Sequence, residues 1–298
     1  MLFERQKCLL ALVNALGGEV GNLDFQKLLL LYCREVEVTP TYDFVPYRFG
    51  GFSFTSYADR RRLTERGLLA EEERYWRLTP EGRAAARIAP LAQMRMDQFA
   101  QHHAGLRGDA LFAETYRRHP YYAIRSEMAE RVLAGDDAAL GAIAAARPAA
   151  VGPGLCTIGY EGRTLESYLN RLLQNGVTLL CDVRRNPLSR KYGFSKGTLS
   201  KACDGVGLRY EHLPELGIAS EERRELHTQA DYDALFAVYE RDSLPRQTDA
   251  LAKIRHWVKA GERVALTCFE RLPHQCHRHC VAEALENNFG PSCAPQHL

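Results

Sequence analysis

From Leu155 onward, short apolar segments alternate with amphipathic ones, and this alternation limits the fold more than any other feature of the chain. The segment VTLLCDV is a continuous apolar run, typical of a strand buried on both faces of a sheet. Further strands are expected at CTIG, GLRYEHL and RVALTCF. Strands that alternate with helices predict an α/β domain over residues 153–298, built on a mostly parallel sheet that helices cover.

Residues 1–89 follow a helix-rich pattern. One apolar helix ends at Gly17-Gly18, a second begins near Asn22 or Asp24, and Ser53 is a plausible N-cap for a third that runs to about Arg66. Two short strands with a polar turn follow, and then Thr79-Pro80 begins another helix. The run RRLTERGLL…RYWRLTPEGR resembles the recognition helix, wing and following helix of winged-helix domains. Residues 90–152 are expected to form a helical connector and linker.

Composition narrows the class of protein. The 298 residues fit two domains, and the net charge of +2 gives no global basic field for nucleic acid or membranes. No apolar run reaches the roughly 20 residues that span a bilayer, and we identify no signal peptide. The nine cysteines are scattered singly, as in a protein with reduced thiols. We therefore expect a cytoplasmic protein without a membrane partner, and leave a homodimer open.

Polar residues follow the predicted strands of the second domain. Ligands in such folds bind outside the carboxyl ends of the strands. Glycines at 159 and 162 could present backbone amides to an anion, and arginines 163, 184 and 278 could form bidentate contacts with phosphate. A helix start beside His277 and Arg278 would lower the thiol pKa of Cys276. The resulting candidates are catalytic Asp182, Glu215, Cys276 and His277, and ligand-binding Gly159, Tyr160, Gly162, Arg163, Arg184, Ser189, His212 and Arg278.

Four motifs carry a family resemblance. The segments TIGYEGR, CDVRRNPLSRKYGFS, YEHLPELG and CFERLPHQCHR occur in this order. They resemble the bacterial domain-of-unknown-function family 488 over roughly residues 155–288. The resemblance implies a compact three-layer α/β fold and brings no established reaction.

The sequence does not predict a metal site. Cysteines and histidines crowd the segment that ends the last predicted strand and begins the last helix: Cys268, His274, Cys276, His277, His279 and Cys280. Their spacing matches no usual pair-and-pair zinc pattern. We therefore predict no metal and no cofactor.

The candidate residues favour an enzyme that acts on a phosphate-bearing substrate, a nucleotide or nucleic acid. In one alternative, a ligand-responsive regulator binds an effector in the same pocket without turnover. In another, a rhodanese-like sulfurtransferase forms a persulfide on Cys276. The winged-helix-like part would contact duplex DNA or a protein partner. Its candidate nucleic-acid contacts are Arg60, Arg61, Arg62 and Arg77, while Glu71–Glu73 at the wing tip would repel DNA.

Overall fold

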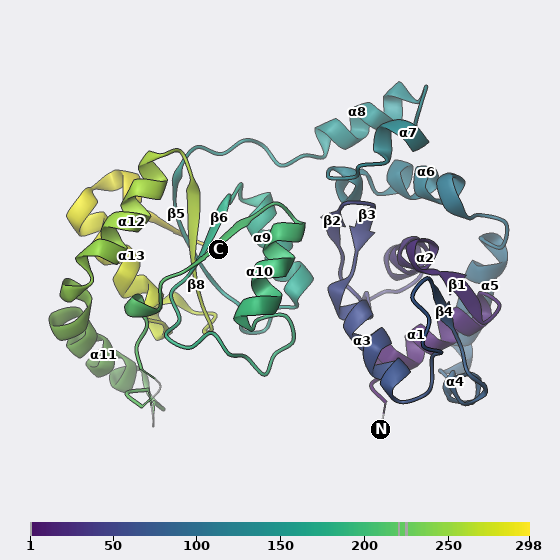
Figure 1. The fold of residues 1–298 in the computed structure, drawn as a ribbon, viewed down its shortest axis with the longest axis horizontal. Helices are drawn as coiled ribbons and strands as arrows, with labels where there is room; N and C mark the ends of the chain where they lie inside the picture. Colours follow the sequence, from purple (N-terminus) through teal and green to yellow (C-terminus); the bar gives the residue numbers. More distant parts are fainter. Residues whose placement is uncertain (1, 220, 224–225) are drawn as a thin grey trace. The chain divides into compact units, whose positions relative to one another are not determined.

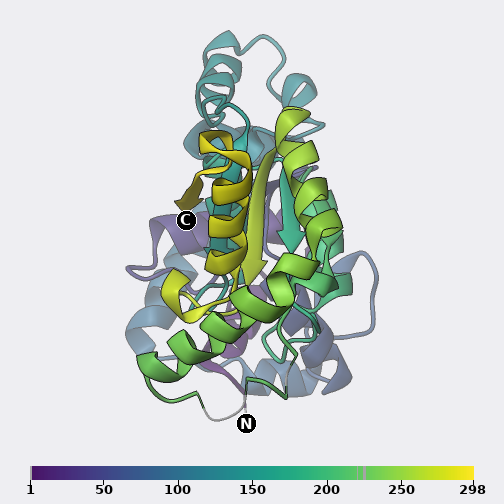
Figure 2. The ribbon, with the colours of Figure 1, turned by 90° about the vertical axis from the view of Figure 1, so that its left-hand side faces the viewer.

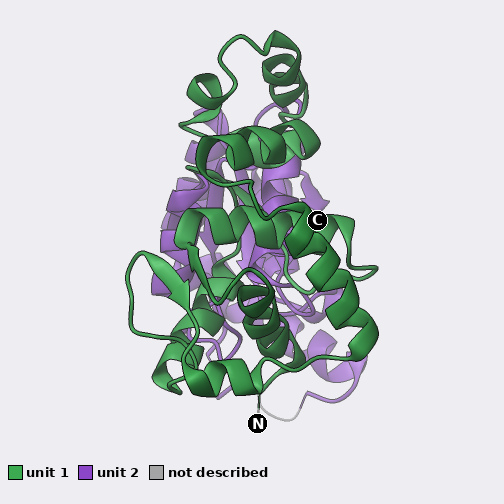
Figure 3. Cartoon of the chain, turned by 90° about the vertical axis from the view of Figure 1, so that its right-hand side faces the viewer, with its two compact units in different colours: residues 1–147 green, residues 148–298 purple. Residues whose placement is uncertain are grey.

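The computed structural model describes residues 2–219, 221–223 and 226–298. The chain divides into two compact units, residues 1–147 and 148–298 (Figures 1 and 3). None of the helices in these described ranges combines the length and apolar character that a membrane crossing requires.

Unit 1 begins with a helical core edged by short strands. Its elements in order are α1 (Glu4–Ala15), β1 (Glu19–Gly21), α2 (Asn22–Glu35), β2 (Val45–Tyr47), β3 (Gly50–Phe52), α3 (Phe54–Glu65), β4 (Tyr75–Arg77) and α4 (Pro80–Ala85). Strand β4 pairs antiparallel with β1, and Leu69 forms an antiparallel bridge with Leu78. The sequence reading missed β1 and the β2–β3 hairpin, because strands of three residues are too short to show a period.

The predicted helix starts of unit 1 are correct. The Ser53 hydroxyl accepts a hydrogen bond from the Ser56 amide at the start of α3, at 3.3 Å. The Thr79 hydroxyl does the same for the Gly82 amide, at 3.0 Å, with Pro80 in the first turn of α4. These side chains satisfy amides that have no partner within the helix.

The segment expected as a connector adds four helices to unit 1. They are α5 (Pro90–His102), α6 (Gly108–Arg118), α7 (Ala129–Val132) and α8 (Asp137–Ala145). Met96 and Phe99 of α5 and Leu111 of α6 are buried in the same apolar core as Leu28 and Leu29 of α2. Much of residues 90–147 therefore belongs to a packed structure.

Unit 2 is built on a five-stranded sheet in which every pairing is parallel. Its strands are β5 (Gly154–Gly159), β6 (Leu179–Asp182), β7 (Arg209–His212), β8 (Arg263–Cys268) and β9 (Pro295–His297), in the spatial order β7-β6-β8-β5-β9. The edge strand β9 was not expected, because Pro-Gln-His carries no strand signal.

Helices cover both faces of this sheet. Helices α9 (Leu165–Gln174) and α10 (Lys196–Gly205) lie on one face, and α12 (Thr248–Lys259) and α13 (Arg278–Phe289) on the other (Figures 1 and 2). Successive strand residues serve opposite faces. Leu266 packs in the cluster that holds residues of α12 and α13, whereas the Thr267 hydroxyl accepts a hydrogen bond from Tyr168 of α9 at 2.7 Å. The predicted three-layer α/β arrangement is thus present.

Between β7 and β8 the sequence predicts three helices, and the last two, over about 231–242 and 246–260, are present as α11 and α12. Helix α11 spans Gln229–Val238 and continues through a π-helical turn, Tyr239–Ser243. The first of the three was expected over about 219–228. Its described residues include only a turn at 221–223, and Ser220, Arg224 and Glu225 lie outside the described residues.

A buried lysine makes the stability of unit 1 depend on pH. Complete burial lowers the pKa of Lys27 from 10.5 to about 7. Its ammonium donates to the Gly51 carbonyl at 3.3 Å. Between these two pH values the unfolded chain holds a proton that the folded protein has lost, so stability rises with pH in this window.

We expect Lys27→Met to remove this rise. Between pH 7 and pH 10, the free energy of unfolding of the wild type should rise by roughly a few kcal/mol more than that of Lys27→Met. Denaturant titrations at several pH values measure the difference. The control Lys7→Met, at a half-buried position of α1, should follow the wild-type curve. Parallel curves for Lys27→Met and the wild type would contradict the account.

Candidate functional site

The sheet register gathers polar residues at one edge. Asp182, the last residue of β6, pairs with His212 of β7 on one side and with Thr267 of β8 on the other. Cys268, the next residue of β8, pairs with Gly159, the last residue of β5. The four strand ends chosen from the sequence therefore lie side by side.

A buried ion pair occupies this edge. The guanidinium of Arg184 donates to both carboxylate oxygens of Asp182, from Nε at 2.8 Å and from Nη2 at 2.5 Å. Its Nη1 donates to the Tyr160 hydroxyl and to the Phe194 carbonyl, each at 2.9 Å. Asp182 is fully buried and also accepts from the Tyr210 hydroxyl at 2.7 Å. Burial and the nearby Asp182 raise the pKa of Tyr210, which keeps its hydroxyl protonated.

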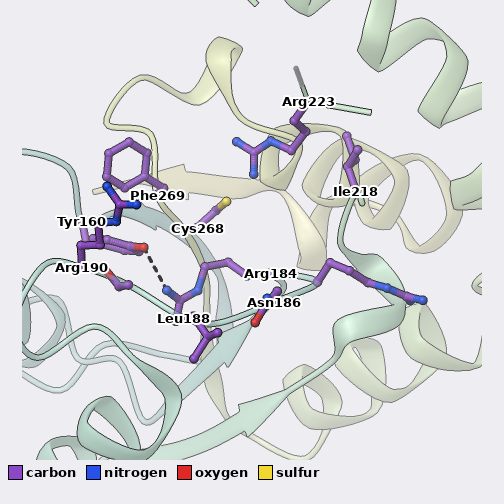
Figure 4. A pocket seen from close by; sticks show the side chains of 11 residues that line it. Tyr160, Arg184, Asn186, Leu188, Arg190, Ile218, Arg223, Cys268 and Phe269 are labelled. Atoms are coloured by element: carbon purple, nitrogen blue, oxygen red, sulfur yellow. Dashed lines mark hydrogen bonds between the residues drawn. The ribbon is translucent and has the colours of Figure 1, made fainter. Parts of the chain in front are cut away.

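A pocket of about 310 Å³ opens beside this pair (Figure 4). Four arginines line it and, among the described lining residues, none is acidic. The set is Tyr160, Arg184, Arg185, Asn186, Leu188, Ser189, Arg190, Ile218, Arg223, Cys268 and Phe269. Arg185 and Arg190 are exposed, whereas Arg184 is 5% exposed. The mouth of the pocket therefore carries positive charge that ligands can reach.

The position of the pocket follows from the topology. The chain leaves β5 toward α9 on one face of the sheet and leaves β8 toward α13 on the other. Neighbouring strands whose connections part in this way leave a crevice at their carboxyl ends. Three lining residues come from these two strand ends. Tyr160 directly follows β5, Cys268 is the last residue of β8, and Phe269 directly follows β8.

Cys268 is a buried thiol in the wall of the pocket. Figure 4 shows it among the lining residues, between Arg184 and Arg223. Its Sγ lies 3.5 Å from Oε2 of Glu270 and 3.7 Å from Nδ1 of His277. Burial raises the pKa of Glu270 to about 7, against the opposing effect of Arg223, with which it forms an ion pair.

The expected low pKa of Cys276 is wrong. Burial, with the neighbouring Cys268 thiol, raises the pKa of Cys276 to about 11. The residue has no exposed surface, and it precedes the N-cap His277, so that α13 itself begins only at Arg278. Removal from water disfavours the thiolate more than the neighbouring His277 favours it.

The other predicted catalytic residues also stand behind or beside the pocket. Asp182 is engaged by Arg184 and has no free oxygen facing solvent, so an acid–base role does not fit its surroundings. His277 is buried, and Glu215 lies in a short 3-10 turn (Pro214–Leu216) outside the lining set. His212 lies outside it as well, with Nε2 at 2.9 Å from the Arg184 carbonyl.

Two amides of the turn between Gly159 and Gly162 are occupied. The amides of Tyr160 and Glu161 donate to the Cys268 and Phe269 carbonyls, at 3.3 and 2.9 Å. Gly159 is needed for a different reason, because a Cβ there would lie 1.9 Å from the Glu270 carbonyl oxygen. Gly162 supplies a turn with φ of 72°. The glycines 159 and 162 thus shape the loop and do not line the pocket.

Two predicted anion-binding arginines are also used internally. Arg278 is 1% exposed and donates to the carbonyls of Glu270 and Arg271, at 2.6 and 3.1 Å. Arg163 reaches the Leu298 carbonyl at 3.4 Å. Of the predicted ligand-binding residues, Tyr160, Arg184 and Ser189 line the pocket.

Five lining residues with a cationic, aromatic or thiol side chain are absent from the predicted site residues, although the first two stand at predicted strand ends: Arg185, Cys268, Arg190, Arg223 and Phe269. Arg190 and Phe269 carried a usable signal, because the run RRNPLSRK is dense in cations and Phe269 directly follows a predicted strand. Arg223 had none, since it reaches the site from a distant segment through its ion pair with Glu270.

Of the four arginines of unit 1 that were predicted to contact nucleic acid, two are engaged within the protein and two are exposed. Arg60 donates to the Tyr75 carbonyl at 2.8 Å and to the Glu72 carbonyl. Arg77 forms ion pairs with Glu19 at 2.5 Å and Glu72 at 2.7 Å. Arg61 and Arg62 are exposed on α3. Arg60 and Arg77 therefore hold the β-structure in place, and Arg61 and Arg62 remain accessible.

Comparison with known proteins gives one result for unit 2. Residues 164–285 match the family model described as Domain of unknown function DUF488. The resemblance inferred from the motifs is confirmed for these residues, whereas Gly159–Arg163 lie before the matched range. No curated protein and no solved structure matched the chain.

We expect Asp182→Ala to destabilise unit 2 by about 3–5 kcal/mol, because it leaves the buried Arg184 without its counter-charge. Chemical denaturation monitored by circular dichroism measures the change. The control Asp204→Ala, at an exposed position of α10, should stay within about 0.5 kcal/mol of the wild type. A loss below about 1 kcal/mol for Asp182→Ala would show that the pair is dispensable.

Proposed function

We propose that unit 2 is an enzyme that binds and transforms a phosphate-bearing substrate, a nucleotide or a nucleic-acid end, in the pocket at the strand ends. The observation that carries the proposal is the charge of this pocket: four arginines and no carboxylate among its described lining residues. Guanidinium groups match the geometry of phosphate oxygens and keep their charge at all physiological pH values.

The exposed arginines are the ones that suit a ligand. The charge of Arg184 is compensated by Asp182, so this residue shapes the pocket and contributes little net positive charge. Arg185 and Arg190 line the pocket, are exposed, and have no carboxylate within ion-pair distance in the described residues, although Nη1 of Arg185 donates to the Pro214 carbonyl at 3.5 Å. A phosphate group bound there would contact guanidinium groups whose charge no carboxylate neutralises.

The apolar lining residues favour a ligand with an organic part. Phe269 is 41% exposed, although it packs edge-on against Tyr160 at 5.3 Å between ring centroids. An exposed ring beside cationic groups is the surface on which nucleobases stack. The pocket volume of about 310 Å³ lies within the range of sites for small molecules.

Cys268 favours a catalytic function for the pocket over ligand binding alone. Its thiol lies in the pocket wall, buried next to a histidine and a glutamate, and offers a nucleophile or a metal ligand with a base beside it. The regulator alternative assigns no task to this group. Cys276 is fully buried and outside the lining set, so a persulfide at that position lacks access to the pocket.

For unit 1 we propose a winged-helix-like module that contacts DNA or a protein partner. Support comes from the order α1, β1, α2, α3, β4 and from the antiparallel pairings of β4 with β1 and of Leu69 with Leu78. Arg61 and Arg62 on α3 would meet the partner.

We expect Arg190→Gln and Arg185→Gln each to weaken binding of a nucleoside monophosphate about tenfold, the effect of losing one charge-assisted contact. Isothermal titration calorimetry measures the affinity, which should fall as salt is added. The matched control is Arg209→Gln, because Arg209 is the first residue of β7 and so lies at the amino ends of the strands, whereas the pocket lies at their carboxyl ends.

An unchanged affinity in both pocket variants, or an equal loss in Arg209→Gln, would refute the assignment of the pocket. Binding that depends on Arg185 and Arg190 without consumption of any bound nucleotide or 5′-phosphorylated oligonucleotide would favour the regulator alternative over the enzyme.

A further inference from the structure

Three side chains from two segments converge beneath the pocket. Sγ of Cys268, Sγ of Cys276 and Nδ1 of His277 all lie within 4.8 Å of one another. Cys268 ends β8, whereas Cys276 and His277 precede α13, so the loop between them folds back on the strand. All three residues are buried. We refer to them as the Cys-Cys-His cluster.

One distance within the cluster matches that of a tetrahedral metal site. Zinc binds thiolate sulfur at about 2.3 Å and imidazole nitrogen at about 2.0–2.1 Å, which places a sulfur and a nitrogen ligand about 3.6 Å apart in a tetrahedron. Sγ of Cys268 and Nδ1 of His277 are 3.7 Å apart. Cys268 and His277 therefore already stand at the spacing that a shared ion requires, and Sγ of Cys276 lies within 4.8 Å of both ligand atoms.

The orientation of His277 is that of a metal ligand. Its Nε2 lies 3.0 Å from the Val183 carbonyl oxygen. A carbonyl only accepts, so Nε2 carries the proton and Nδ1 presents its lone pair toward the two thiols. Histidines that bind zinc are typically held by such a contact of the second ring nitrogen with a carbonyl or carboxylate.

The surroundings of the cluster add one further oxygen. Oε2 of Glu270 lies 3.5 Å from Sγ of Cys268, while its other oxygen pairs with Arg223. Cys268 itself lines the pocket. An ion held by the three side chains would therefore have its remaining position near the pocket, with a carboxylate beside it.

We propose that Cys268, Cys276 and His277 bind one Zn²⁺ ion, with the fourth position left for a water molecule or a substrate atom on the pocket side. Two sulfurs and one nitrogen with an open position form a known type of catalytic zinc site. The sequence spacing argued against a metal, because it shows no pair-and-pair pattern. The fold supplies the missing proximity by placing the end of β8 against the start of α13.

The test is metal binding by the full-length protein. Chelator-treated protein is mixed with Zn²⁺ and examined by native mass spectrometry, which should show a single ion per chain. Cys276→Ser should lose this ion. The matched control is Cys280→Ser, because Cys280 is a buried cysteine of α13, the helix that follows Cys276, and belongs to a separate group with Glu240 and His279.

Cobalt provides a second readout that needs no variant. Co²⁺ added to the chelator-treated wild type should give thiolate-to-metal charge-transfer absorption and the visible bands of a tetrahedral ion. The charge-transfer intensity grows with the number of bound thiolates, so it distinguishes the two-thiolate Cys-Cys-His cluster from the one-thiolate group of Glu240, His279 and Cys280 even where Cys276→Ser fails to fold.

Three results would overturn the proposal. The first is a wild type that binds neither Zn²⁺ nor Co²⁺. The second is an ion that survives Cys276→Ser or disappears equally in Cys280→Ser. The third is a disulfide between Cys268 and Cys276 in the protein as purified under reducing conditions. The Zn²⁺ measurements are independent of the pocket arginines, so they can fail while the anion-binding proposal stands, and the reverse also holds.

Discussion

The ion pair of Asp182 and Arg184 is the interaction on which the pocket depends. Arg184 joins the end of β6 to the loop after β5 through Tyr160, and to the loop before α10 through Phe194. A buried guanidinium is costly unless its charge and its donors are satisfied. The carboxylate, the hydroxyl and the carbonyl meet this need, and together they fix the loops that form the pocket wall.

Charge is divided between structure and ligand at this edge of the sheet. The buried cations Arg184 and Arg278 are committed to protein oxygens. Arg185 and Arg190 remain at the surface of the pocket. An anion that enters would therefore meet accessible guanidinium groups on a wall already held rigid by internal pairs. The Cys-Cys-His cluster lies below, where a bound ion would add further positive charge.

The fold was largely predictable from the sequence, and the site only in part. Alternating apolar and amphipathic segments predict the parallel sheet and its two helical layers, because burial on both faces requires that pattern. The same rule identified the strand ends at Gly159, Asp182, His212 and Cys268. It could not rank the residues there. Asp182 looks like a catalytic acid in sequence, and only the contacts with Arg184 reveal that it is a structural counter-ion.

Burial and long-range approach account for the remaining errors. A helix start and basic neighbours suggested a reactive Cys276, but neither reveals that the residue is sealed from water. Arg223 reaches the pocket from a segment whose position no local pattern defines. The Cys-Cys-His cluster likewise depends on how the β8–α13 loop folds back, which residue spacing alone does not encode.

A crystal structure of the full chain with a nucleoside monophosphate tests the central claim most directly. The account predicts the phosphate group in the strand-end pocket, within hydrogen-bond distance of at least one of Arg185, Arg190 and Arg223. A nucleotide bound elsewhere on the chain, with this pocket empty, would contradict it.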